Sequence, residues 1–205
     1  MPNWCWSQVH ICTDEEKLNK LYEEMKKALS SNKLGADFGN EWLGNLLVYT
    51  GMDSEEVIHG HIGCRGSITD YGIDDNGELI MNLETAWNPQ FGAIKKFIEF
   101  VLGEDAEYDF YYTAEESGCG LFCSNEDDMI DTYQIDTFDA DEALDHLVAF
   151  YSYTTEDDLH RGLVEYLGHD GEFEDLLEEA SKKAEEEGRG LYFNKYEYID
   201  WLDFT

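Results

Sequence analysis

The sequence predicts the α+β fold class, and three observations carry this prediction. Hydrophobic residues make up 42% of the 205 residues, which is sufficient for a packed core. Up to about residue 115, stretches with the two-residue period of strands alternate with stretches at helical spacing. Beyond residue 138 the pattern is mostly helical. We therefore expect one globular domain at 1–137 and, at 138–205, a helical extension with a final strand that packs on the first part.

The first predicted elements are a strand and a helix. The stretch WCWSQVHICT, residues 4–13, alternates between two faces as a strand does. Thr13 and Glu16 have the spacing of a helix capping box, and apolar residues then follow at helical spacing. These signals predict a helix from about Asp14 to Ser30.

An insertion, residues 31–60, follows this helix and precedes a hairpin. The insertion begins with turn-forming residues and continues into the apolar run EWLGNLLVYTGM, which predicts a short helix around Trp42. Two strand-like runs, IGCRGSITDY and ELIMNLETAW, then lie on either side of the turn sequence DDNG. Because Asn76 and Gly77 tolerate a positive φ, we expect the two runs to pair as a hairpin.

The rest of the chain contains a second amphipathic helix, further strands and an acidic helical region. The run QFGAIKKFIEFVLG predicts a helix that ends at Gly103. Strands are predicted at EYDFYYTAEE, GLFCS and DTYQIDTF. Helices are predicted at DADEALDHLVAFYSY, EDDLHRGLVEYLG and EFEDLLEEASKKAEEEG, and the aromatic strand LYFNKYEYIDW follows them.

The order of these elements predicts the arrangement of the sheet. Residues 3–115 have the order strand, helix, strand, strand, helix, strand, which is that of a ferredoxin-like split βαβ core. Right-handed crossovers place both helices on one face of such a sheet. The other face then needs a cover or a partner, and we expect the C-terminal helices from Asp139 onward to cover it.

Three motifs resemble a known family in sequence. They are the opening MPNWC, with Pro2 to Cys5, the motif TAWNP at Thr85 to Pro89, and the tyrosine-rich strand with its glycine turn at Tyr108 to Phe122. They occur in the order typical of the YubB-type ferredoxin-like family of plasmid and phage proteins, over about the first 125 residues. The resemblance implies a ferredoxin-like core and a mobile-element origin, and it implies no catalytic residue. The helix around Trp42 and the extension after Phe138 depart from the family pattern.

Charge is the strongest functional signal in the sequence. The chain has 13 Lys and Arg against 47 Asp and Glu, a formal net charge of -34. Binding to nucleic-acid phosphates or to an anionic membrane requires a Lys and Arg surface, so direct contact with either is not expected. The expected partner is a basic protein surface, such as that of a nuclease or another DNA-binding protein.

The compartment is predicted to be the cytoplasm. No stretch approaches the ~20 apolar residues of a membrane span, and the N-terminal sequence lacks the basic and apolar regions of a signal peptide. Five cysteines are an odd number in a chain that is long enough to fold without disulfides. We therefore expect reduced thiols and no structural disulfide.

One segment concentrates the negative charge. From Phe97 to His160, 64 residues contain no Lys or Arg. If aligned, the 34 uncompensated carboxylates of the chain would imitate the phosphates of about 10 to 20 base pairs, which makes the chain a candidate DNA mimic. The predicted contact residues are Glu104, Asp105, Glu107, Asp109, Glu115, Glu116, Glu126, Asp127, Asp128, Asp131, Asp136, Asp139, Asp141, Glu142, Asp145, Glu156, Asp157 and Asp158.

The acidity is also consistent with two alternative roles. In the first, the carboxylates form a solvated surface, for example in a salt-adapted host. In the second, the chain is an accessory protein for conjugation or replication. It would dock through the apolar sheet face or the Trp42 segment, with acidity serving only solubility.

From the pattern of histidines and cysteines we expect neither a cofactor nor enzymatic activity. A zinc site can be drawn from His59, His61 and Cys64 with Cys119 and Cys123, but these fall on different elements and lack the usual close pairing. We expect loop histidines and small buried thiols instead. Cys119 lies on a glycine turn where a nucleophile would be exposed, although a turn between strands accounts for the glycines more simply.

Aromatic residues on the predicted strands are expected to serve the core and an interface. Stacking on RNA bases requires cationic neighbours, and the segment from Phe97 to His160 has none. The aromatic residues in question are Trp4, Trp6, Trp87, Tyr108, Phe110 and Tyr112.

Overall fold

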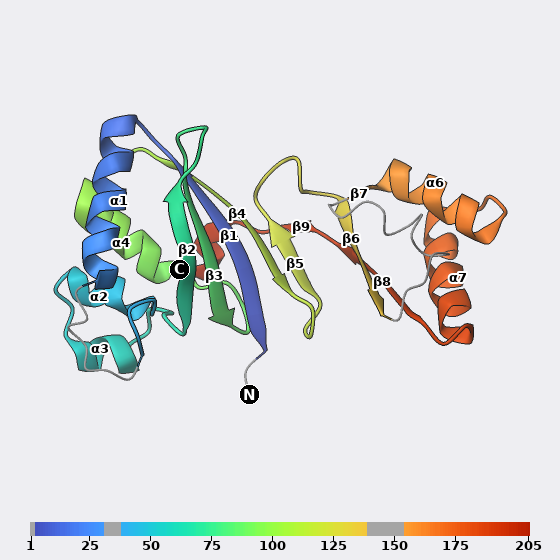
Figure 1. Ribbon diagram of the computed structural model, residues 1–205, viewed down its shortest axis with the longest axis horizontal. Coiled ribbons are helices and arrows are strands. Elements are labelled where there is room, and N and C mark those ends of the chain that lie inside the picture. The colour runs from blue at the N-terminus through green and yellow to red at the C-terminus, as the bar shows by residue number, and fades with distance from the viewer. Residues whose placement is uncertain (1–2, 31–37, 139–153) are drawn as a thin grey trace. The chain divides into compact units, whose positions relative to one another are not determined.

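The computed structural model describes residues 3–30, 38–138 and 154–205 and confirms the α+β class (Figure 1). The chain divides into two compact units. Unit 1 comprises Met1–Glu126 together with Ile199–Thr205, and unit 2 comprises Asp127–Tyr198. The predicted boundary at residue 137 is therefore wrong, and the last residues belong to the first unit rather than to the extension.

Unit 1 is built on an antiparallel sheet. Within this unit the strand order is β2-β3-β1-β4-β5, and each strand is antiparallel to its neighbours (Figure 1). All five strands occur where strand patterns predict them. Their bounds are Trp4–Cys12 for β1, Gly66–Ile73 for β2, Leu79–Ala86 for β3, Asp109–Glu116 for β4 and Leu121–Ser124 for β5.

The central strand β1 has one buried and one open face. Val9 lies opposite Met81 of β3 and Tyr112 of β4, and all three side chains are fully buried. Trp4 and Trp6 project from the opposite face and are about half exposed. The alternation predicted from the sequence is thus present, because successive side chains of a strand point to opposite faces.

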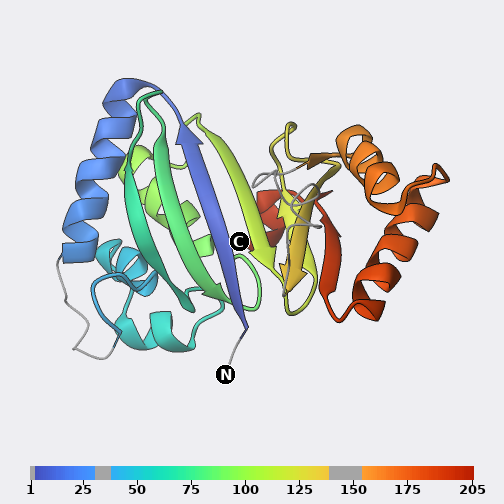
Figure 2. The same ribbon diagram turned by 45° about the vertical axis from the view of Figure 1, so that its right-hand side comes forward.

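Two helices cover the buried face of this sheet (Figure 2). They are α1 (Glu15–Ser30) and α4 (Gly92–Leu102), and α4 ends at Gly103, whose φ of 102° is in the region that favours glycine. Both helices lie where the sequence predicts them. Leu21 of α1 and Phe97 of α4 are fully buried in the shared core.

The predicted capping box at the start of α1 does not form. The Asp14 carboxylate accepts the Lys17 backbone N–H at 3.0 Å, so Asp14 caps the helix. The Thr13 hydroxyl instead donates to the Glu107 carbonyl at 3.1 Å. Thr13 therefore joins the first helix to the loop before β4.

The insertion contains two short helices, α2 (Gly44–Tyr49) and α3 (Ser54–His59). The helix near Trp42 is confirmed, whereas α3 is an element that the sequence patterns do not predict. Before α2 the chain is hydrogen-bonded to β2, because Trp42 forms an isolated bridge with Ser67. The insertion thus adds to the edge of the sheet of unit 1.

The last residues of the chain form a 3₁₀ helix, η1 (Trp201–Phe204), which packs in unit 1. The Trp201 ring stacks on Phe110 with the ring centroids 4.3 Å apart. The Phe91 backbone N–H donates to the Phe204 carbonyl at 2.9 Å. The aromatic C-terminus therefore belongs to the core of unit 1 and is not the end of a long strand.

Unit 2 has a small antiparallel sheet with two helices. The strand order is β7-β6-β8, with β6 at Thr132–Phe138, β7 at Thr154–Thr155 and β8 at Gly190–Lys195. The helices are α6 (Glu156–Leu167) and α7 (Phe173–Glu186). A further two-residue strand, β9, covers Glu197–Tyr198.

The core of unit 2 uses the apolar faces of its own helices. Leu163 of α6 and Ala180 of α7 are fully buried in one cluster with Leu191 of β8. These helices therefore bury their apolar residues within unit 2, and the expectation that they cover the open face of the first sheet stays a prediction. The helix predicted at residues 139–153 lies outside the described residues.

No helix in the described part of the chain is long and apolar enough to cross a membrane.

Candidate functional site

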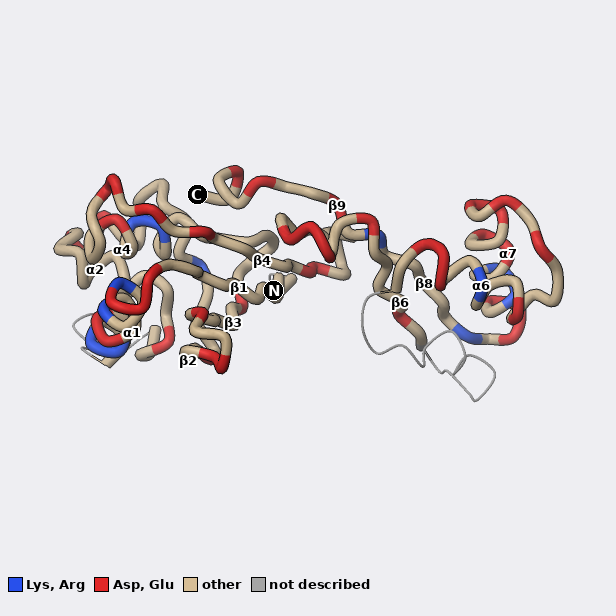
Figure 3. The backbone as a smooth tube through the Cα atoms, turned by 90° about the horizontal axis from the view of Figure 1, so that it is seen from above, with Lys and Arg blue, Asp and Glu red and all other residues tan. Residues whose placement is uncertain are grey.

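Carboxylates occur on both units rather than on one element. Figure 3 shows Asp and Glu on helices, strands and loops of each unit, with few Lys and Arg among them. The predicted contact residues are divided in the same way, because the boundary between the units falls at residue 126. Each unit therefore carries its own acidic surface.

In unit 1 four of the predicted acids lie on the loop between α4 and β4 and on the first residue of β4. Gly103 ends α4, and its carbonyl accepts the Ala106 backbone N–H at 3.2 Å. The Thr13 hydroxyl holds the other end of the loop through the Glu107 carbonyl. Its four carboxylates are exposed and form no ion pair with any described residue. We call this surface the acidic loop, and its members are Glu104, Asp105, Glu107 and Asp109.

The remaining predicted residues of unit 1 are less accessible. Glu116 is only 3% exposed, and its Oε1 accepts the Gly118 backbone N–H at 3.1 Å. The prediction that Glu116 is a contact carboxylate is therefore wrong, because its side chain is turned into the protein. Glu115 and Glu126 are half-buried.

In unit 2 the register of the sheet brings two of the predicted acids together. Thr132 pairs with Thr155, which places Asp131 beside Glu156. Lys195 forms an ion pair with Asp131 at 2.9 Å, and the hydrogen bond to this carboxylate raises the pKa of Lys195. This cation neutralises part of the negative charge at the site.

The other predicted acids of unit 2 have different surroundings. Asp127 and Asp128 are exposed and have no ion-pair partner in the described structure. Asp136 is half-buried and accepts a hydrogen bond from the Asn194 amide at 2.8 Å. The residues Asp139, Asp141, Glu142 and Asp145 lie outside the described residues.

The acids at the start of α6 also stabilise the helix. Glu156, Asp157 and Asp158 occupy its first turn, where negative charge interacts favourably with the helix dipole. Arg161 pairs with Asp158, and this hydrogen bond, together with that of Thr155, lowers the pKa of the Asp158 carboxyl. Glu156 and Asp157 are exposed and make no ion pair with a described residue.

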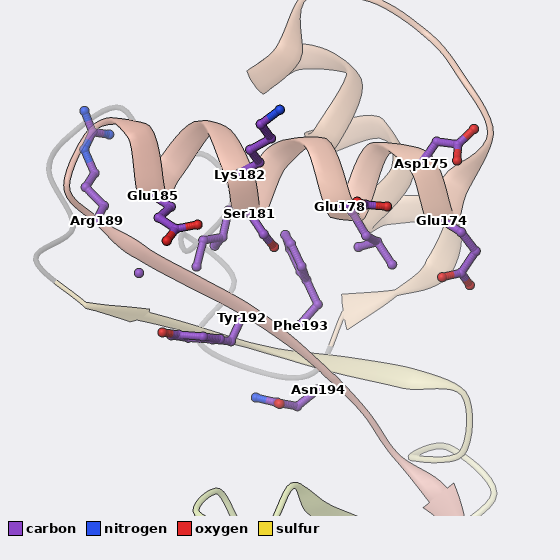
Figure 4. A pocket seen from close by; sticks show the side chains of 13 residues that line it. Glu174, Asp175, Glu178, Ser181, Lys182, Glu185, Arg189, Tyr192, Phe193 and Asn194 are labelled. Atoms are coloured by element: carbon purple, nitrogen blue, oxygen red, sulfur yellow. The ribbon is translucent and has the colours of Figure 1, made fainter.

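A groove of about 1000 Å³ lies between α7 and β8 in unit 2 (Figure 4). Four carboxylates line it and form no ion pair with a described residue. Of the two cations in the lining, Arg189 pairs with Glu187 at 3.2 Å, and Lys182 points away from β8 in Figure 4. We call this site the α7–β8 groove, and its carboxylates are those of Glu174, Asp175, Glu178 and Glu185.

The sequence prediction missed this groove because it selected the segment without Lys and Arg. The groove lies in a segment that contains cations, at Lys182 and Lys183. The spacing of Glu174, Glu178 and Glu185 nevertheless places these residues along one side of a helix. This helical spacing in the sequence could have been used to predict that these carboxylates share one surface.

The histidines and cysteines that were weighed as zinc ligands do not come together as a metal site in the described part of the chain. His59 and His61 are exposed, and the buried Cys64 thiol donates to the Val57 carbonyl at 3.5 Å. Within residues 3–30, 38–138 and 154–205, no group of three or more His, Cys, Asp or Glu side chains is arranged to hold a metal ion.

Cys119 is exposed, as its position in a glycine turn predicts. Its surroundings do not activate it, because a hydrogen bond to the Glu116 carboxylate and desolvation raise the pKa of the thiol. The Asn3 amide donates to its sulfur at 3.8 Å. A raised pKa reduces the fraction of thiolate, which is the nucleophilic form.

The aromatic residues of the sheet fall into two groups. Phe110 and Tyr112 are buried, and Tyr108 is half-buried. Trp4, Trp6 and Trp87 are about half exposed. The first group serves the core, whereas the second group leaves an aromatic surface open to a ligand or partner.

Comparison of the chain with protein-family models, with curated proteins and with solved structures finds no match. The resemblance to YubB-type proteins stays an expectation from the three sequence motifs.

Proposed function

We propose that this protein is a non-enzymatic interaction protein of a mobile genetic element that binds the basic surface of a nuclease or another DNA-binding protein. One observation carries the proposal: the acidic loop presents four exposed carboxylates that form no ion pair with a described residue, although Lys17 and Lys96 lie near enough to Glu107 and Glu104 to interact with them electrostatically. Like charges held this close repel one another. A cationic partner relieves that repulsion, and the carboxylates then take the place of DNA phosphates on the partner.

The α7–β8 groove adds a second surface of the same sign. It is elongated along a helix and a strand, and within the described residues β8 pairs with β6 on one side only. A Lys- or Arg-rich segment fits such a groove, because its charges meet the four carboxylates and its backbone can lie along β8. This surface acts within unit 2 and needs no contribution from unit 1.

We further propose that unit 1 has a ferredoxin-like core. The supporting observation is the strand order β2-β3-β1-β4 with every neighbour antiparallel, since a split βαβ arrangement places its four strands in that order. The fold itself implies no activity, because unrelated functions occur on the same fold.

A competition experiment tests the proposed function. A histone octamer, which binds duplex DNA without sequence preference, is mixed with a fluorescent duplex, and the chain is added while anisotropy is followed. We expect the chain to displace the duplex at about 0.1 M NaCl and to lose this ability at about 0.5 M, because salt screens the attraction. Displacement that is unchanged at high salt would contradict an electrostatic mechanism.

Charge-reversed variants locate the contact surface. The pairs are Glu104→Lys with Asp105→Lys in the acidic loop, and Asp127→Lys with Asp128→Lys in unit 2. The matched control, Asp70→Lys with Asp75→Lys, changes the net charge equally at exposed positions outside the predicted set. We expect at least one predicted pair to weaken binding about tenfold and the control to weaken it less than about threefold. Equal effects of all three pairs would show that no predicted surface is recognised.

The alternative, docking through an apolar surface, is favoured by a different observation. Trp4, Trp6 and Tyr111 all project from the open face of the sheet of unit 1 and are 50%, 54% and 39% exposed. A partner held by these side chains would stay bound at about 0.5 M NaCl, because burial of apolar surface is not weakened by screening. The salt dependence of a pulldown therefore distinguishes the two functions.

A further inference from the structure

A pocket of about 450 Å³ in unit 1 differs from the rest of the molecular surface. It lies where the insertion meets the ends of β1, β2 and β3, so segments far apart in the sequence contribute to it. The volume lies within the range of small-molecule sites. We call it the aromatic pocket, and its lining residues are Trp4, Phe38, Trp42, Ile58, Cys64, Arg65, Gly66, Ser67 and Ala86.

The walls of the aromatic pocket are large apolar side chains that remain accessible. Trp4, Phe38 and Ile58 are 50%, 51% and 42% exposed, although they belong to three different segments. The Phe38 ring stacks on Trp42 with the ring centroids 4.5 Å apart. Large apolar side chains gathered at one hollow mark a binding site more often than single exposed residues do.

The floor of the pocket depends on two glycines. A Cβ atom at Gly44 would lie 2.3 Å from the Trp42 indole, so only glycine allows the ring to lie against α2. A Cβ atom at Gly66 would lie 2.3 Å from the Glu84 carbonyl oxygen. The shape of the pocket is therefore set by close backbone packing beneath it.

The charge of the pocket is opposite to that of the chain. Although 47 of the residues in the protein are acidic, none of the described residues that line this pocket is an Asp or Glu. Among the described lining residues the charged one is Arg65, one of only 13 Lys and Arg in the chain. The Arg65 backbone N–H is held by Gln90 at 2.7 Å, while its guanidinium makes no ion pair or hydrogen bond with a described residue.

From this arrangement we infer that the aromatic pocket binds a small planar aromatic carboxylate, with its ring against the exposed side chains of Trp4 and Phe38 and its carboxylate on Arg65. Aromatic rings stack favourably on indoles, and a guanidinium pairs with a carboxylate through two parallel hydrogen bonds. The basic partner of the proposed function is not the occupant, because Arg65 repels it and no carboxylate among the described lining residues attracts it. This inference is independent of the proposed function.

Calorimetric titration of the full chain with 2-naphthoate tests the inference. We expect saturable one-to-one binding with a Kd of about 0.1 mM, in keeping with the affinity available to a ligand of this size. The neutral analogue 2-naphthol should bind about tenfold more weakly, and the cationic 2-naphthylmethylammonium more weakly still, because each lacks the contact to Arg65. Preference for the cation, or absence of saturable binding by all three, would overturn the inference.

Matched variants assign the binding to this pocket. Trp4→Ala and Arg65→Gln should each weaken 2-naphthoate binding about tenfold. Trp6→Ala is the control for Trp4, since it lies two residues away on the same face, is equally exposed and does not line the pocket. Arg161→Gln in unit 2 is the control for lost charge. Equal weakening by the variants and their controls would overturn the assignment.

The proposed function and the inferred ligand site can be disproved independently of each other. Binding of 2-naphthoate should persist at about 0.5 M NaCl, where displacement of DNA is expected to be lost. Thermal unfolding of Arg65→Gln verifies that this exposed substitution leaves the fold intact.

Discussion

At the scale of single residues, Glu116 shows how a neighbouring carboxylate decides the chemistry of a thiol. All five cysteines lie in described parts of the chain, and Cys119 alone is exposed. Burial raises the pKa of Cys5 to about 11, and burial with the Glu78 carboxylate raises that of Cys12 to about 12. Exposure would make Cys119 the reactive thiol, but the hydrogen bond to Glu116 opposes its ionisation.

We predict that Glu116→Gln accelerates the labelling of Cys119 by a thiol reagent. The raised pKa places the midpoint of the rate against pH above the ordinary value for a thiol, and removing the carboxylate charge shifts this midpoint to lower pH. Gln retains an oxygen for the Gly118 N–H. The measurement is the labelling rate between about pH 7 and 10, which spans the ordinary thiol pKa.

Glu115→Gln is the matched control for this experiment. It removes the same charge one residue away, from a side chain on the opposite face of β4. A midpoint that moves equally in both variants would mean that net charge, rather than the contact with Glu116, controls the thiol.

At the scale of elements, β2 shows that two glycines in one strand have different roles. A Cβ atom at Gly66 would collide with the Glu84 carbonyl at 2.3 Å, because β2 and β3 approach closely at this point. At Gly72 a Cβ atom would meet nothing within 4 Å. The first glycine is therefore required by packing, and the second is not.

We predict that Gly66→Ala lowers the free energy of unfolding by about 1 to 3 kcal/mol, the usual cost of overpacking. Gly72→Ala should leave the free energy of unfolding unchanged or raise it by up to about 1 kcal/mol, because alanine restricts the unfolded chain. Urea denaturation of both variants measures the difference. A Gly66→Ala protein as stable as Gly72→Ala would show that the strands can separate at no cost.

At the scale of the whole molecule, uncompensated negative charge opposes the compact state. The net charge of -34 is carried by both units, and many carboxylates have no described cationic partner. Repulsion among them is reduced when salt shortens the distance over which charges interact, from about 30 Å at 0.01 M to about 8 Å at 0.15 M.

We predict that Tm rises as NaCl increases from about 0.01 M to about 0.5 M, because screening reduces self-repulsion more in the folded than in the expanded chain. Calorimetry at several salt concentrations measures this. The same increase with KCl would assign the effect to screening rather than to bound sodium. A Tm that falls with both salts would show that attractive ion pairs dominate the stability.

Local patterns were sufficient to predict most elements. The alternation in WCWSQVHICT predicted β1, and the turn DDNG predicted the hairpin of β2 and β3, because these signals depend on residues close together in the chain. The helix cap was misassigned because Thr13 and Asp14 are both suitable caps. Only the position of Glu107 opposite Thr13 decides between them.

The sequence by itself determined the α+β class, the order of the five strands and two helices that build the sheet of unit 1, and the large excess of negative charge, since composition and periodicity are properties of the chain alone. Tertiary structure alone decided that Glu116 is buried, that residues 199–205 return to unit 1, and that Trp4 and Trp42 line one pocket. The physical reason is that burial and convergence depend on contacts between segments far apart in the chain. A local sequence pattern does not indicate those contacts.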